Sequence, residues 1–67
     1  MRDRDGIKAE AKTIAAKLMA SLRAGKIQVI GIHTISAACD EATHGLWNND
    51  DFEQLVNLTV RAVVEGV

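Results

Sequence analysis

Residues 50–65 read DDFEQLVNLTVRAVVE, a stretch whose apolar side chains recur at the spacing of an α-helix. Asp50 is well placed to cap its start, and Glu53 follows three residues later in the position of a capping-box acid. The residues at helical spacing are Phe52, Leu55, Val56, Thr59, Val60, Val63 and Val67, and Leu58, Ala62 and Val64 widen the apolar arc. The remaining positions, Gln54, Asn57, Arg61 and Glu65, form a polar face. The stretch therefore predicts an amphipathic helix that is held by packing, because valine is a mediocre helix former.

A second helix is predicted over residues 4–24, where apolar residues again recur three or four positions apart. That stripe consists of Ile7, Ala11, Ile14, Leu18 and Leu22. A second stripe of small residues lies on the opposite side of the helix and consists of Ala9, Thr13, Ala16 and Ala20. The small residues either permit close approach of a second copy or reflect only the high helix propensity of alanine.

The middle of the chain permits two interpretations. Residues 34–44 are helix-like, with Thr34 or Ser36 as possible caps. Residues 27–35 are rich in β-branched side chains, so they form either a strand or an apolar connection that leads into an early turn of the helix. In the second interpretation Ile27, Ile30 and Ile35 fill the core between the outer helices.

Length and composition predict one all-α domain over residues 1–67, with three helices and a small core. A chain of this size buries only about 60% of its unfolded surface, so it needs a supplement such as a disulfide, a metal or oligomerisation. Its single cysteine, Cys39, excludes an internal disulfide. We therefore expect a homo-oligomer, most simply a dimer, that completes the domain. The residues expected to mediate self-association are Ile7, Ile14, Leu18, Leu22, Val56, Val60 and Val63.

Charge is distributed unevenly along the chain. Seven of the eight basic residues and three of the nine acidic residues lie in residues 1–26, so this segment carries +4 and the remainder −5. Arg4, Lys8 and Lys12 lie on one face of the predicted first helix. This face is a solvated surface, a contact for phosphate, or a contact for acidic protein surface, including that of a second copy.

The order strand, helix, turn, helix over residues 26–67 resembles that of ribbon-helix-helix repressors. The resemblance implies a dimer whose paired strands, here Ile27–Ile32, enter the major groove of DNA. It implies Lys26 and Gln28 as the residues that read the bases. The surrounding acidic residues oppose this interpretation, because they repel phosphate.

The sequence favours neither catalysis nor a bound cofactor. His33, Asp40 and His44 share one face if residues 33–44 are helical, but Cys39 points elsewhere and a metal site is not expected. Cys39 has no activating base near it in sequence, so it is expected to be a buried structural residue. Trp47 either covers the core together with Leu46 or serves as an exposed aromatic anchor for a partner.

These features predict a small, non-catalytic interaction module that self-associates and regulates, inhibits or adapts a partner protein. Arg4, Lys8, Lys12 and Trp47 are the expected partner-binding residues. The alternative is a dimeric DNA-binding transcriptional regulator. The lone cysteine, the charged first residues and the absence of a long apolar run favour a cytoplasmic protein that does not enter membranes.

Overall fold

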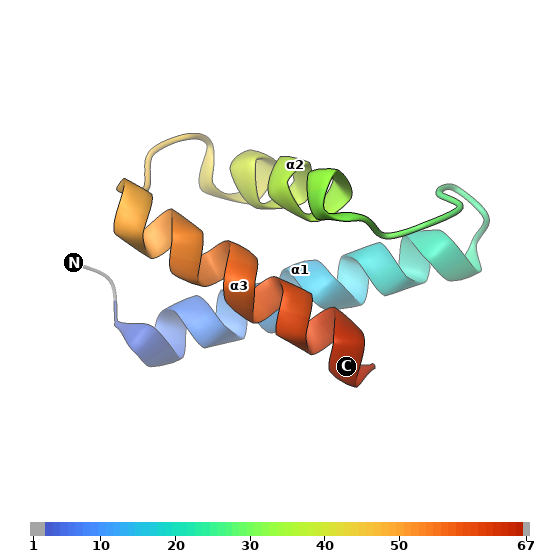
Figure 1. Cartoon of the computed structure of the whole chain (residues 1–67), viewed down its shortest axis with the longest axis horizontal. Coiled ribbons are helices and arrows are strands. Elements are labelled where there is room, and N and C mark those ends of the chain that lie inside the picture. The colour runs from blue at the N-terminus through green and yellow to red at the C-terminus, as the bar shows by residue number, and fades with distance from the viewer. Residues whose placement is uncertain (1–2, 67) are drawn as a thin grey trace.

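The helix expected at residues 50–65 is present as α3, Asn49–Glu65, in a computed structural model that describes residues 3–66. α1 spans Arg4–Arg23 and α2 spans Ile32–Thr43 (Figure 1). The predicted all-α class with three helices is thereby confirmed. Val67, expected on the apolar stripe of α3, lies outside the described residues.

The strand interpretation of residues 27–35 is wrong, because residues 3–66 contain helices and loops and no strand. Residues 27–30 form the connection, and α2 begins at Ile32, two residues before the expected start. Ile35 is buried, while Ile27 and Ile30 are partly buried and pack against the core. The three isoleucines therefore fill the core as the second interpretation predicts.

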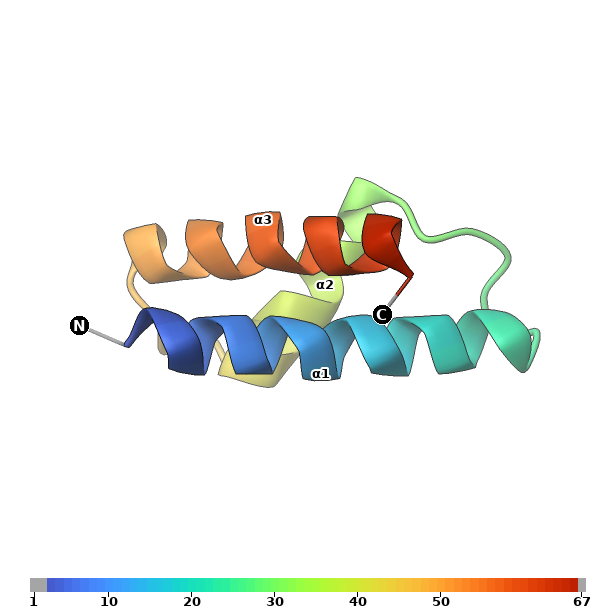
Figure 2. The ribbon, with the colours of Figure 1, turned by 90° about the horizontal axis from the view of Figure 1, so that it is seen from below.

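The helices form an up-down-up arrangement. α1 and α3 run in the same direction, and α2 returns in the opposite direction (Figure 1). Seen from below, α1 and α3 lie side by side with α2 behind them (Figure 2). The packing of α1 against α3 is far more extensive than that of α2 against either helix. The paired outer helices are thus the frame on which α2 is held.

The core is small, as the composition predicts. Its buried cluster consists of Ile7, Ala11, Ile14, Leu18, Ile35, Cys39 and Leu55. Four of the five residues in the predicted apolar stripe of α1 belong to this cluster, and Leu22 is half-buried. The opposite stripe of small residues, Ala9, Thr13, Ala16 and Ala20, is fully on the surface. Within the single chain, helix α1 therefore buries one face and leaves the opposite face exposed.

A glycine ends α1, as the sequence indicates. Gly25 has φ of 76°, a left-handed conformation that glycine adopts at low cost. Its N–H donates to the carbonyl of Leu22 at 3.1 Å, and the N–H of Lys26 donates to that of Ser21 at 2.9 Å. This pair of bonds is the Schellman motif, which satisfies carbonyls at the end of the helix. The motif turns the chain back toward α2.

The starts of α2 and α3 differ from the expected caps. The cap of α3 is Asn48, not Asp50: its Oδ1 accepts from the N–H of Asp51 at 2.8 Å. The Asn48 Nδ2 also donates to Oδ2 of Asp51 at 3.1 Å. At α2 the capping position is Gly31, whose N–H donates to Oγ1 of Thr34 at 3.4 Å. Thr34 therefore acts from inside the first turn, and Ser36 lies beyond it.

Candidate functional site

A groove between α1 and α3 gathers the basic residues that the sequence singles out. Arg4, Lys8 and Lys12 follow one another at four-residue spacing along α1 and line one wall. Residues of α3 line the other wall, and the hollow has a volume of about 230 Å³. We call it the basic groove; its α3 residues are Leu58, Arg61, Ala62 and Glu65.

Arg61 is the residue that completes this site. It is the only basic residue after Lys26, and the packing of α3 against α1 places it across from Arg4. Both arginines also line an adjoining hollow of about 370 Å³ with Gln54, Asn57 and Leu58. Two guanidinium groups from different helices thus border one continuous depression.

The four cations of the basic groove are available to a ligand. Arg4, Lys8, Lys12 and Arg61 are all exposed, and none forms an ion pair with another described residue. Glu65 is the single acid that lines the groove. Cations that line a hollow raise the local positive potential, and guanidinium groups bind carboxylate or phosphate in a bidentate manner. The groove is therefore suited to an anionic group.

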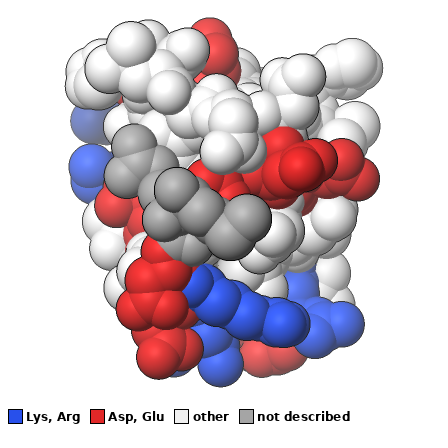
Figure 3. Space-filling view, turned by 90° about the vertical axis from the view of Figure 1, so that its left-hand side faces the viewer, with Lys and Arg blue, Asp and Glu red and all other residues white. Residues whose placement is uncertain are grey.

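Acidic surface lies immediately beside this basic area. Figure 3 shows the end of the molecule where α1 and α3 begin, and there basic and acidic areas adjoin. The acidic residues at the start of α3 include Asp50 and Glu53, which are exposed, and Asp51, which is buried. The two charged segments of the sequence therefore meet at one end of the fold.

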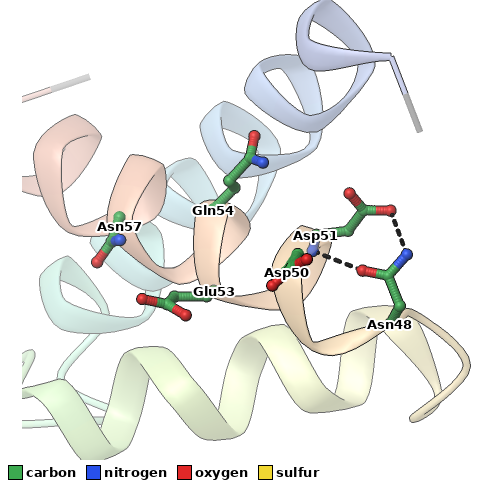
Figure 4. Close-up of a pocket in the computed structure, with 6 residues that line it drawn as sticks. All are labelled: Asn48, Asp50, Asp51, Glu53, Gln54 and Asn57. Carbon is green, nitrogen blue, oxygen red and sulfur yellow. Dashed lines mark hydrogen bonds between the residues drawn. The ribbon is translucent and has the colours of Figure 1, made fainter. Parts of the chain in front are cut away.

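The hollow over the start of α3 has a different character. Its volume is about 340 Å³ and all of its lining residues come from a single segment (Figure 4). Two of them, Asn48 and Asp51, are bonded to each other in the helix cap. Within residues 3–66 no three His, Cys, Asp or Glu side chains are grouped to hold a metal ion. The hollow is thus the polar surface around the start of α3.

The sequence places His33, Asp40 and His44 on one face if residues 33–44 are helical. His33 is exposed in the first turn of α2, Asp40 is exposed near its end, and His44 caps that end with φ of 54°. Because His44 leaves the helix, it does not continue the face that His33 and Asp40 were expected to share. The shared face requires a helix that continues through His44, one residue beyond the end of α2.

Trp47 is half-buried and packs against the core cluster. Leu46, expected to cover the core with it, is instead 81% exposed. Trp47 thus combines a core contact with accessible ring surface.

The residues expected to mediate self-association divide into two groups. Ile7, Ile14 and Leu18 are covered by the chain's own core, whereas Leu22, Val56, Val60 and Val63 are only half-buried.

Cys39 lies at the contact between α2 and α3, with no exposed surface. Its Sγ lies 3.6 Å from Oγ1 of Thr59, and that hydroxyl lies 2.7 Å from the carbonyl oxygen of Leu55. The single hydroxyl hydrogen of Thr59 is used in the short bond to Leu55, so the thiol is the donor to Thr59. Burial raises the pKa of Cys39, and the hydrogen bond with Thr59 opposes this only in part. The thiol is a packed structural group, as the sequence indicates.

Two features of this site escape sequence reasoning. Nothing in the spacing of Arg61 shows that it faces α1, because the relative rotation of two helices is set by packing. The bond between Cys39 and Thr59 joins residues 20 positions apart, which local patterns do not relate. For Arg61, the only signal in the sequence that its side of α3 faces α1 is that the nearby Leu58 and Ala62 are apolar.

Comparison with protein-family models, curated proteins and solved structures finds no match to this chain. Among the described helices, none combines the length and apolar character needed to traverse a bilayer.

Proposed function

We propose that this protein is a small, non-catalytic protein–protein interaction module of the cytoplasm. In this proposal it self-associates and regulates, inhibits or adapts a partner protein by docking an acidic segment of that partner into the basic groove. The observation that carries the proposal is the convergence of Arg4, Lys8, Lys12 and Arg61 from two helices around one depression, where none of them has an ion-pair partner among residues 3–66.

The apolar lining of the groove favours an acidic segment of a protein over other anions. Leu58 is half-buried and Ala62 is buried, and both line the groove beside the cations, so the groove offers apolar contact as well as charge. A peptide with acidic and apolar residues uses both features. Trp47 supplies a second contact in this proposal, because a partly exposed ring is a common interface anchor.

A dimeric DNA-binding regulator is the second candidate, because the same four cations also suit phosphate. Against it stand Glu65 in the groove and Asp50 and Glu53 on the adjoining surface, which repel a polyanion that extends beyond the groove. An acidic peptide is short enough to avoid them.

The test compares two anionic probes. Fluorescently labelled poly-glutamate and a short random-sequence DNA duplex are titrated with the protein at about 50 mM salt. We expect poly-glutamate to bind more tightly than the duplex, and K8E or R61E to weaken its binding about tenfold, or 1.4 kcal/mol. K17E is the matched control. Lys17 is also exposed on α1, but it lines a separate hollow between α1 and α2 and not the basic groove.

The outcomes separate the candidates. Tighter binding of the duplex supports the DNA-binding regulator and contradicts acidic-peptide docking. Equal loss of poly-glutamate binding in K8E and K17E reduces the effect to net charge and also contradicts the proposal. If neither probe binds, the basic groove is not an anion site.

A further inference from the structure

One face of α3 is apolar yet lies outside the core of the single chain. Val56, Val60 and Val64 recur at four-residue spacing and therefore form one stripe along the helix, which we call the valine stripe. Val56 and Val60 are half-buried with their inner side against the core, and Val64 is 80% exposed. The stripe is thus continuous with the core and open to water at its outer edge.

The valine stripe and the basic groove lie on different sides of α3. Leu58 and Ala62, which line the groove against α1, are offset from the stripe by two residues in sequence, or about half a helical turn. A ligand on either surface leaves the other accessible. The stripe is therefore a separate surface that the binding of an acidic segment does not use.

The whole molecule has surface to bury. Its accessible surface is 4717 Å², whereas a compact monomer of 7.2 kDa exposes about 4100 Å². The chain thus exposes more surface than a typical compact monomer of its mass. Two further apolar side chains, Val29 and Ile32, are 71% and 56% exposed where α2 begins. Because α2 runs opposite to α3, that point lies at the same end of the molecule as Val64 (Figure 1).

Charge favours one orientation of a second copy on this face. The end of α2 and the start of α3 carry exposed acids, Asp40, Glu41, Asp50 and Glu53. The opposite end, where α1 leads into α2 and α3 ends, carries exposed Arg23 and Lys26 together with one exposed acid, Glu65 (Figure 1). An antiparallel arrangement places the exposed Asp50 and Glu53 of each copy toward the end of the other copy that carries Arg23 and Lys26. A parallel arrangement places like charges together, which disfavours it.

We infer that two copies of this chain pair about a two-fold axis through antiparallel contact of their α3 helices along the valine stripe. Val60 meets the partner's Val60 at the axis, and Val56 meets the partner's Val64. This inference rests on the self-association in the proposed function and names its surface, but it is independent of the basic groove. Apolar burial supplies the affinity, and the charged ends fix the orientation.

The first test places a charge in the stripe without disturbing the monomer. V64K adds a lysine at an exposed position in the last turn of α3, where a cation suits the helix dipole. Light scattering on a gel-filtration column should give the wild type twice the 7.2 kDa mass of the chain, and V64K should weaken the dimer at least tenfold. The control L46K makes the same change at a comparably exposed leucine outside the stripe and should remain dimeric.

The second test probes the axis. V60C should form an intermolecular disulfide rapidly on mild oxidation, because residue 60 faces its own copy, and L46C should not. A monomeric wild type, or a dimer that V64K and L46K affect equally, overturns the inference. Faster cross-linking of L46C than of V60C overturns the antiparallel geometry. Poly-glutamate binding measured on V64K separates the two proposals, because the basic groove is intact in this variant.

Discussion

Thr59 joins α3 to α2, the helix that is packed least extensively against the others. Its hydroxyl donates to the carbonyl of Leu55 within α3 and accepts from the thiol of Cys39 on α2. All three residues have no exposed surface, so the thiol has no water as an alternative acceptor. An unsatisfied polar group in such a place costs about 1–3 kcal/mol, less for the weakly polar thiol.

We expect T59V to lower the free energy of unfolding by about 1 kcal/mol, because it removes the acceptor of the thiol while keeping the shape of the side chain. Urea denaturation measures the change. T13V is the matched control: Thr13 makes the same bond, to the carbonyl of Ala9 at 3.1 Å, but on an exposed surface. Its effect should stay within about 0.5 kcal/mol. A stability of T59V equal to that of the wild type would show that the buried pair contributes nothing.

For single residues, the sequence predicts burial better than it predicts which side chains form hydrogen bonds with each other. The periodicity of α1 places Ile7, Ile14 and Leu18 on one apolar face, and that face is buried because burial follows the helical period. The sequence assigns these three residues to self-association, whereas the chain's own core covers them. It also predicts Cys39 to be buried. Its partner Thr59 is not predictable, since the pairing depends on how α2 crosses α3.

The spacing of apolar residues predicts the three helices closely, but it does not predict the residues at which α2 and α3 begin. Asn48, Asn49, Asp50 and Asp51 are four consecutive residues of good capping type, so local preference alone does not choose among them. The structure uses Asn48, and Asp51 is buried beside it. The choice therefore reflects how the first turn of α3 packs.

N48A should destabilise the protein by about 1 kcal/mol, because the N–H of Asp51 loses its acceptor. D50A, at the position that sequence alone favours as the cap, should cost less than about 0.5 kcal/mol, since Asp50 is exposed. The midpoints of urea denaturation, compared at equal slope, give both values. The reverse order of the two effects would place the functional cap at Asp50.

The whole molecule presents two kinds of surface on the two sides of α3. The sequence shows the charge division between its first 26 residues and the remainder, but it does not show that Arg61 joins the basic group. It also predicts Val56, Val60 and Val63 as contacts for a second copy. It cannot show which valines stay accessible. The packing of α3 sets the rotation of this helix about its own axis, and that rotation leaves Val63 half-buried and Val64 exposed. Self-association is thus proposed on the surface that the single chain leaves open.

The dependence of the melting temperature on protein concentration tests self-association most directly. A dimer is stabilised by mass action, so a hundredfold rise in chain concentration adds about 2.7 kcal/mol and should raise Tm by roughly 5–10 °C. The V64K variant should show a much smaller rise over the same range, with its helical content unchanged by circular dichroism. A wild-type Tm that stays constant across the hundredfold range would show that the chain folds and functions as a monomer, contrary to the proposed self-association.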